Sequence, residues 1–494
     1  MRLTELAERY GRGTDALLVE IDLEGNRREI THAALRDLVL ERARQLTAAG
    51  LRRGRAIGIR ARNGIDWVSW DLAALEVGAL VKAFADDTAI GEPEEFLKRH
   101  GLALLISDDE TEHPCVVAPG GAVPERLFAD APDAAAGRSD LHSLVYSSGT
   151  AGTLKGLDIS RSGTEYVITR FIECFDITAE DRHLIFLPLS NYQQRLSVYC
   201  CLWTGSDLVL APYNRVFAAL RSEAPTFVIG PPVFYDAIAQ LHGKAGGGAT
   251  LGEFLGGRIR FMITGMAPIR RHTLDRFWAG GVRLLEAYGL TECGMIAWNT
   301  PDAHRVGTVG RLIDPDAVAF LPDGELLVRR PAPLSLGYFE GGDAAEEVFR
   351  ADGSIATGDY GRLDADGYLT LIGRKKDVIA LGSGRKVHPA EIEGEFAGLE
   401  GVAELVVVPT PGTARLGAIV TPADPADEAS RGAIRERIEQ ANQGLEPHRR
   451  IAAVVFADTP LRSDPRFMTA NLKLSRHRAA EHFAELAAAG RTQG

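Results

Sequence analysis

Apolar and polar positions follow two different patterns along the chain up to Gly265. Residues 31–50 (THAALRDLVLERARQLTAAG) carry apolar side chains every three or four positions and end at Gly50, which predicts an amphipathic helix. Residues 67–81 predict a second helix with small side chains for close packing. Short, continuously apolar segments bounded by turn residues occur at 55–61, 102–108, 183–189, 207–212, 226–232 and 259–265. They predict buried strands, and the fold class is therefore α/β with doubly wound sheets.

The pattern changes from about Val318 onward. Residues 324–330 (GELLVRR) and 367–373 (GYLTLIG) alternate polar and apolar positions, which predicts a small unit rich in β-strands. After Gly373 come a charged turn, two apolar strand segments at 402–410 and 417–422, and a helix over 430–443. This last part predicts a compact α+β domain of about 120 residues, a usual size for a domain.

Composition narrows the classes of function. With 494 residues the chain is too long for one core, and its net charge of −12 argues against general nucleic-acid binding. It holds no run of about 18 apolar residues, so no membrane span is expected, and its first residues lack the apolar core of a signal peptide. The five cysteines have no metal-binding spacing and predict a reducing, cytoplasmic location.

The segment YSSGTAGTLKG, residues 146–156, concentrates hydroxyls, glycines and one lysine. Taken alone, it has two interpretations. It could form a surface hairpin turn, in which glycine supplies positive φ and hydroxyls satisfy the backbone. It could also form a phosphate cradle, in which backbone N–H groups, hydroxyls and Lys155 surround an anion.

The order of the unusual segments decides between these interpretations. After 146–156 come FLPLSNYQQ (186–194), ITGMAPI (263–269), AYGLTECG (287–294), a long segment from ATGDYG to PAEIE (356–393), and TANLKLSR (469–476). In this order and at these separations the chain resembles the adenylate-forming superfamily. That family includes acyl-CoA synthetases, firefly luciferase and the adenylation domains of peptide synthetases. The resemblance covers nearly the whole chain and favours the phosphate cradle.

The resemblance implies an architecture and a chemistry. Residues 1–375 would form a large adenylating domain of two α/β subdomains plus a β-barrel, and residues 377–494 a small mobile α+β lid, with the hinge at Lys376. The shared reaction converts a carboxylic acid and ATP to acyl-AMP and pyrophosphate, usually followed by transfer to a thiol. ATP, Mg²⁺ and CoA are the expected cofactors, and catalysis would rest on positioning and on neutralising phosphate charge.

Residue roles follow from the matched motifs. Lys473, Glu292 and Thr291 match catalytic positions, and Glu292 and Thr150 would hold Mg²⁺. Tyr288 would stack on adenine, and Asp359 would accept hydrogen bonds from the ribose hydroxyls. The full set of implied ATP-binding residues is Ser147, Ser148, Gly149, Thr150, Lys155, Gly265, Met266, Ala267, Glu286, Ala287, Tyr288, Gly289, Asp359 and Arg374.

Two further sites concern the acid and the thiol. Asn191, Tyr192 and Gln193 match the wall of the acyl pocket, where most relatives carry a histidine or an aromatic residue at the position of Asn191. This wall, together with Gln194 and Arg195, is unusually polar in sequence, which favours an aryl or polar acid over a plain long alkyl chain. The loop with Gly384, Arg385 and Lys386 would approach CoA in the thiol-transfer state.

Several functions fit this resemblance. The leading one is an acid–CoA ligase acting on an aryl or polar acyl carboxylate, a small-molecule substrate. A second is an acyl-AMP ligase that loads a separate carrier protein. A third is a diazotase-like enzyme that activates nitrite for an aryl amine. A noncatalytic binding protein would be expected to lose Lys473, Glu292 or Asp359, and all three are present.

Overall fold

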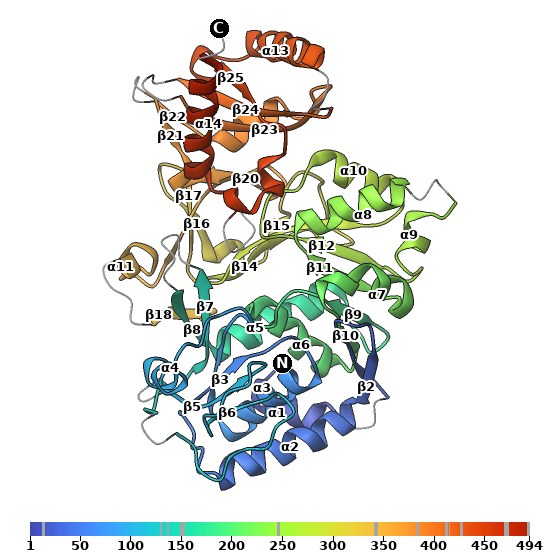
Figure 1. The fold of residues 1–494 in the computed structure, drawn as a ribbon, viewed down its shortest axis with the longest axis vertical. Helices are drawn as coiled ribbons and strands as arrows, with labels where there is room; N and C mark the ends of the chain where they lie inside the picture. The colour runs from blue at the N-terminus through green and yellow to red at the C-terminus, as the bar shows by residue number, and fades with distance from the viewer. Residues whose placement is uncertain are drawn as a thin grey trace. The chain divides into compact units, whose positions relative to one another are not determined.

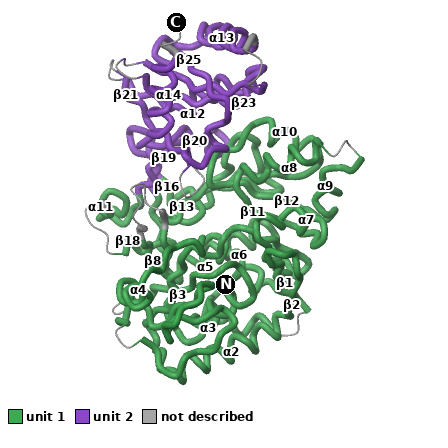
Figure 2. The backbone as a smooth tube through the Cα atoms, in the orientation of Figure 1, with its two compact units in different colours: residues 1–147, 154–318, 328–355 green, residues 148–153, 319–327, 356–494 purple. Residues whose placement is uncertain are grey.

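The chain forms two compact units in the computed structural model (Figures 1 and 2). The structure describes residues 1–11, 15–128, 131–135, 138–148, 154–244, 248–339, 344–381, 385–410, 413, 415–424, 428–468 and 474–491. The first unit comprises residues 1–147, 154–318 and 328–355, and the second is built mainly from residues 319–327 and 356–494. The predicted hinge at Lys376 lies within the second unit by this division, and its role as a hinge stays a prediction.

Two largely parallel sheets form the framework of the first unit. The nine-stranded sheet has the order β15 (Arg311–Leu312), β14 (Gly294–Trp298), β13 (Leu284–Leu290), β12 (Phe261–Thr264), β11 (Phe227–Gly230), β9 (Arg182–Ile185), β10 (Asp207–Leu210), β1 (Leu17–Ile21) and β2 (Arg27–Thr31). The seven-stranded sheet has the order β18 (Ser335–Phe339), β8 (Leu154–Ser160), β7 (Leu141–Ser148), β4 (Leu80–Ala83), β3 (Ala56–Arg60), β5 (Leu102–Ser107) and β6 (Val116–Val117). The predicted α/β fold class is confirmed, and antiparallel pairs occur towards the edges of each sheet.

One apolar core joins the two sheets. It includes Leu208 and Phe227 of the nine-stranded sheet and Ile57 and Val81 of the seven-stranded sheet. Helix α5 (Arg161–Phe175) contacts β8 and β14, and α6 (Tyr192–Thr204) contacts β9 and β10 (Figure 1). The other helices of this unit are α1 (Leu3–Arg9), α2 (His32–Ala48), α3 (Ile65–Val77), α4 (Pro93–His100), α7 (Val216–Glu223), α8 (Pro232–Lys244), α9 (Leu251–Phe254), α10 (Arg271–Ala279) and α11 (Ala344–Val348).

Local sequence signals explain where two of these helices begin and end. Thr31 caps α2, because its side chain accepts a hydrogen bond from the backbone N–H of Ala34. Helix α3 ends at Gly78, whose φ of 76° lies in the left-handed region that favours glycine. The predicted helix 67–81 was therefore too long at its end, since its last residues belong to β4.

The second unit contains the predicted C-terminal α+β domain. An antiparallel sheet of β16 (Val318–Phe320), β17 (Glu325–Val328), β19 (Ile355–Leu363) and β20 (Leu369–Arg374) precedes it. The domain itself has a small pair β21 (Ile379–Ala380) and β22 (Lys386–Val387), and a sheet of β23 (Val402–Pro409), β24 (Leu416–Pro422) and β25 (Ile451–Phe456). Its helices are α12 (Pro389–Glu395), α13 (Glu428–Gln443) and α14 (Arg476–Arg491).

The β-barrel expected beside the α/β subdomains is absent from the described residues. The strands from Val318 onward form the open four-stranded sheet instead, and β18 pairs with β8 of the seven-stranded sheet. A barrel has no free sheet edges, whereas β16 and β20 each stand at an end of the four-stranded order. Within the same residues, no helix is both long and apolar enough to cross a bilayer.

Candidate active site

The segment predicted to form the phosphate loop includes the ends of two strands of the seven-stranded sheet. Strand β7 ends at Ser148 and β8 begins at Leu154, so the turn falls after a buried strand. Gly149 and Thr150 lie outside the described residues, as do the side chains of Ser147, Ser148 and Lys155. Lys473 and Gly384 also lie outside them. The roles assigned to these residues stay predictions.

The expected adenine segments meet at the ends of two parallel strands. Thr264, the last residue of β12, is in register with Glu286 of β13, so residues 265–267 and 286–289 lie at neighbouring strand ends. Ligands of open α/β sheets bind at such carboxyl ends. Met266 has φ 71°, a left-handed conformation that is uncommon for a residue with a long side chain. Backbone strain of this kind is concentrated at functional sites.

Glu286 is a largely buried carboxyl group beside this segment. Its Oε2 accepts a hydrogen bond of 2.7 Å from the backbone N–H of Gly307. Burial raises the pKa of Glu286 to about 7, although Gly307 and the Arg271 charge act in the opposite direction. The carboxyl therefore holds its proton more readily than an exposed glutamate does, and it changes charge near neutral pH.

Glu292 and Thr291 lie in the turn between β13 and the antiparallel strand β14. A Cβ atom at Gly289 would come within 2.7 Å of the Gly294 carbonyl oxygen, so this turn requires glycine there. Tyr338 of β18 donates its hydroxyl hydrogen to Glu292 Oε1 at 3.0 Å. Burial and the Glu292 charge raise the pKa of Tyr338, so it remains a donor. The sequence motifs do not include Tyr338.

Tyr288, predicted to stack on adenine, has only 7% of its surface exposed. It lies in β13, where it pairs with Ala297 of β14. At the neighbouring end of β12, a Cβ atom at Gly265 would meet only the Ala287 carbonyl oxygen, at 3.5 Å. The backbone there is therefore open to close approach by a flat ligand. The stacking role of Tyr288 stays a prediction.

In the second unit, Asp359 and Arg374 are direct partners on the adjacent strands β19 and β20. Arg374 Nε lies 3.1 Å from Asp359 Oδ1, and Asp359 has only 4% of its surface exposed. The two residues that the motifs assign to the ribose are thus brought together. Lys376 lies in a short helical turn, Lys375–Asp377, directly after β20.

The residues assigned to CoA lie in the C-terminal domain. Arg385 precedes β22, where its Nη1 lies 2.9 Å from His448 Nδ1 and 3.9 Å from Glu446 Oε2. Lys386 begins β22 and is exposed. Arg385 is therefore engaged within its own domain, and contact of either residue with CoA stays a prediction.

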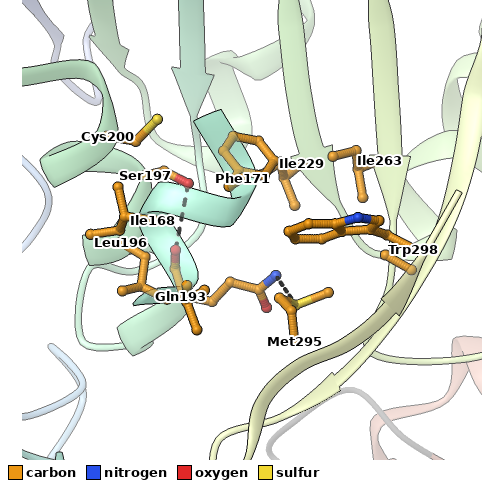
Figure 3. Close-up of a pocket in the computed structure, with 12 residues that line it drawn as sticks. Ile168, Phe171, Gln193, Leu196, Ser197, Cys200, Ile229, Ile263, Met295 and Trp298 are labelled. Atoms are coloured by element: carbon orange, nitrogen blue, oxygen red, sulfur yellow. Dashed lines mark hydrogen bonds between the residues drawn. The ribbon is translucent and has the colours of Figure 1, made fainter. Parts of the chain in front are cut away.

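A mostly apolar cavity of about 40 Å³ lies in the first unit, beside helices α5 and α6 and the strands β11 to β14 (Figure 3). Phe171 and Trp298 supply aromatic walls, and Gln193 and Ser197 are the amide and hydroxyl side chains of the lining. The full lining is Val167, Ile168, Phe171, Gln193, Leu196, Ser197, Cys200, Ile229, Ile263, Ala287, Met295 and Trp298.

Of the three residues predicted to form the acyl wall, Gln193 alone lines this cavity. Asn191 is exposed and caps α6, where its side chain accepts a hydrogen bond from the N–H of Gln193. Tyr192 is buried, with its hydroxyl 2.6 Å from Thr164 Oγ1. One of the residues 191–195 therefore lines this cavity, and the polar acyl wall expected from them stays a prediction. Helical spacing turns neighbouring residues in different directions, so five adjacent polar residues do not share one face.

Comparison with known proteins identifies the family. A model described as AMP-binding enzyme matches residues 3–339, and one described as AMP-binding enzyme C-terminal domain matches residues 376–489. The chain belongs to the AMP-binding enzyme family, which confirms the resemblance to adenylate-forming enzymes. It is similar to a feruloyl-CoA synthase of Amycolatopsis, 28% identical over 423 residues that cover 80% of this chain and 84% of the relative. It is also similar to a long-chain-fatty-acid–CoA ligase of Mycobacterium bovis, 26% identical over 482 residues (82% and 79%). The chain is thus an adenylate-forming enzyme of the acid–CoA ligase class.

Solved structures agree on the fold. An anthranilate CoA ligase in complex with anthranoyl-AMP superposes with a TM-score of 0.79 at 20% identity, covering 99% of this chain and 98% of the other. ATP-bound MatB from Rhodopseudomonas palustris superposes with a TM-score of 0.78 at 22% identity (98% and 99%). At such identities the likeness shows the fold and leaves the substrate open.

Proposed function

We propose that this enzyme activates an aryl carboxylic acid as its acyl-AMP, releases pyrophosphate, and transfers the acyl group to the thiol of CoA. The observation that carries the choice of acid is the cavity beside α6, where Phe171 and Trp298 give a flat ring two aromatic surfaces. Aromatic pairs stabilise one another through offset and edge contacts beyond their buried area. The apolar remainder of the lining suits a ring better than a charged or strongly polar acyl group.

The substrates in the names of the relatives are compatible with an aryl acid, but they do not select it over other acids. One acts on a ferulic acyl group and one on long-chain fatty acids, and the anthranilate ligase of similar fold acts on an aromatic amino acid. The two aromatic side chains of the lining, Phe171 and Trp298, favour a ring over a long alkyl chain. A neutral aryl acid therefore combines the chemistry of the class with the shape of this cavity.

ATP supplies the AMP group that makes the carboxylate carbon reactive. Glu292, whose carboxylate Tyr338 orients, would hold Mg²⁺, and the ion would supply positive charge that neutralises the phosphates. The described residues hold no group of three or more metal-binding side chains, which fits an ion held mainly by its nucleotide. Asp359, held by Arg374, would accept from the ribose hydroxyls.

The decisive assay measures AMP and pyrophosphate release from Mg-ATP with aryl, medium-chain and long-chain acids, each with and without CoA, and with nitrite plus an aryl amine. Release with aryl acids that CoA accelerates is the expected result. Release with aryl acids that CoA does not accelerate would indicate that the acyl group goes to the alternative acceptor, a carrier protein. Release only with alkyl acids, or only with nitrite, would overturn the proposal.

Two lysine variants separate the half-reactions. Lys473→Ala is expected to lower acyl-AMP formation by about a hundredfold or more, because it removes a positive charge from the developing negative charge, and to spare thiol transfer from preformed acyl-AMP. Lys376→Pro is expected to do the reverse, because proline fixes φ at the predicted hinge. Both rates are measured in single turnover. Equal losses in the two half-reactions would contradict the assigned roles.

A further inference from the structure

The cavity beside α6 contains one amide group that is only weakly satisfied. Gln193 Nε2 lies 3.7 Å from Met295 Sδ, and a thioether sulfur is a weak hydrogen-bond acceptor (Figure 3). Ser197 Oγ is 3.5 Å from the backbone carbonyl of Gln193, a long hydrogen bond within the same helix. The remaining lining residues are apolar or carry sulfur, apart from Trp298, whose indole N–H is already engaged with Cys174. The hydrogen-bonding capacity of this cavity is therefore concentrated on one side, at α6.

The size of the cavity requires part of its wall to give way. Its volume is about 40 Å³, whereas a dry cavity of about 150 Å³ takes up benzene. Gln193 and Met295 have the longest flexible side chains of the lining, and they contact each other across the cavity. Methionine adapts its shape easily. An entering ring therefore separates Gln193 from Met295.

Moving Gln193 away from Met295 makes the Gln193 side chain less favourably placed in free energy. Its amide loses its weak acceptor while its neighbours are Leu196, Met295 and Trp298, which offer little in return. Gln193 is partly buried, so an amide that the ring screens from solvent and leaves without a partner costs more than its hydrogen bond contributed. The loss is offset only if the ring itself brings a hydrogen-bonding group to the amide.

We propose that the cavity selects single-ring aryl acids that carry a hydroxyl or amino substituent, and that Gln193 is the residue that reads this substituent. The inference rests on the proposed function and names the acid class within it. A site that hydrogen-bonds a substrate group discriminates strongly against the analogue that lacks it, because its own polar group then stays unpaired. Gln193 is thus the specificity-determining residue of the cavity.

The test compares kcat/KM for AMP release with CoA for benzoate, 3- and 4-hydroxybenzoate, 4-aminobenzoate, 2-naphthoate and decanoate. At least one substituted single-ring acid is expected to exceed benzoate by about tenfold or more, and 2-naphthoate and decanoate are expected to be poorer than benzoate. Equal values for benzoate and all its substituted forms would overturn the inference but leave the proposed function intact. Failure of every aryl acid would overturn the proposed function itself.

A variant of Gln193 tests whether this residue causes the preference for substituted acids over benzoate. Gln193→Met keeps the length of the side chain and removes the amide, so the preference for the substituted acid over benzoate is expected to fall to about twofold or less. Gln240→Met, on the exposed surface of α8, is the matched control and should keep the wild-type preference. A preference unchanged in Gln193→Met would show that another group reads the substituent. The wild-type comparison stands even if the variant does not fold.

Discussion

Helix α6 has two faces with opposite properties. One face lines the cavity with Gln193, Leu196, Ser197 and Cys200. The other carries Tyr192, Arg195 and Tyr199, all fully or almost fully buried in the protein. Both sets follow the spacing of three and four residues that places side chains on one side of a helix. One short helix therefore presents cavity-lining side chains on one side and buried structural anchors on the other.

The anchoring face is a satisfied ionic network. Arg195 has 0% of its surface exposed, and its Nη2 lies 2.5 Å from Asp71 Oδ1 of α3. Tyr199 donates to Asp71 Oδ2 at 2.7 Å, and Arg195 Nη1 donates to Ser143 Oγ of β7 at 2.7 Å. Burial and the Arg195 charge hold the pKa of His142, next to Ser143, well below its ordinary value. His142 thus adds no second positive charge to this network.

The two faces differ in whether their polar groups still have hydrogen-bonding capacity to offer a ligand. On the anchoring face the polar groups have close, strong partners, so the helix is held to α3 and to β7. On the cavity face Gln193 has only a thioether. Variants on the anchoring face should therefore change stability, and variants on the cavity face should change the choice of acid.

The largest expected effect comes from Asp71→Ala, which leaves Arg195 charged and buried without its carboxylate. Breaking a buried pair from one side costs about 3–5 kcal/mol of unfolding free energy. Urea denaturation measures it. Asp275→Ala removes a partner from the exposed Arg271–Asp275 pair, 2.8 Å apart, and should change stability by less than about 0.5 kcal/mol. Similar losses in the two variants would refute the contrast between buried and exposed pairs.

Glu286 extends the comparison, because it is a partly buried carboxyl group whose pKa is raised by burial. Its folded-state pKa of about 7 lies above its ordinary value of 4.5. Protonated Glu286 therefore favours the folded state below about pH 4.5, and this contribution is lost as the pH rises through about 7. Replacement by Gln, which can still accept from Gly307, should stabilise the protein at pH 8 by about 2–3 kcal/mol.

Unfolding free energies of wild type and Glu286→Gln at pH 5, 6, 7 and 8 provide the measurement. The gain of the variant should grow across this range and level off above pH 7. A gain that does not depend on pH would mean that Glu286 is ionised throughout in the folded protein.

The smallest effect is expected for Tyr192→Phe, which removes the hydroxyl that contacts Thr164 Oγ1 at 2.6 Å. The loss should be about 1 kcal/mol of unfolding free energy, since Thr164 keeps its hydrogen bond to the Ser160 carbonyl. KM for the acid should not change, because Tyr192 lies on the anchoring face. Tyr213→Phe, at a half-exposed tyrosine, is the control. A large change in KM for the acid would indicate that Tyr192 belongs to the acyl site.

Local sequence chemistry predicted much of the fold. Thr31 and Gly50 bracket the helix that became α2, and the apolar segments around Ile57, Leu184 and Ile263 became buried strands, because periodicity and caps act over a few residues. The ordered motifs predicted the family, since they are read in sequence without any knowledge of packing. They also assigned Asp359 and Arg374 to the nucleotide, and although that role stays a prediction, Arg374 Nε lies 3.1 Å from Asp359 Oδ1 in the structure.

The tertiary structure alone decided which residues share a surface. Trp298 and Phe171 meet in one cavity although they are far apart in sequence, and Arg195 finds Asp71 124 positions away. Tyr338 reaches Glu292 from a strand that no motif contains. The run 191–195 was polar in sequence, yet the helix directs Gln193 to the cavity and Arg195 to the opposite side. Composition fixes what each side chain can do, but the direction in which it points depends on the packing of the whole unit.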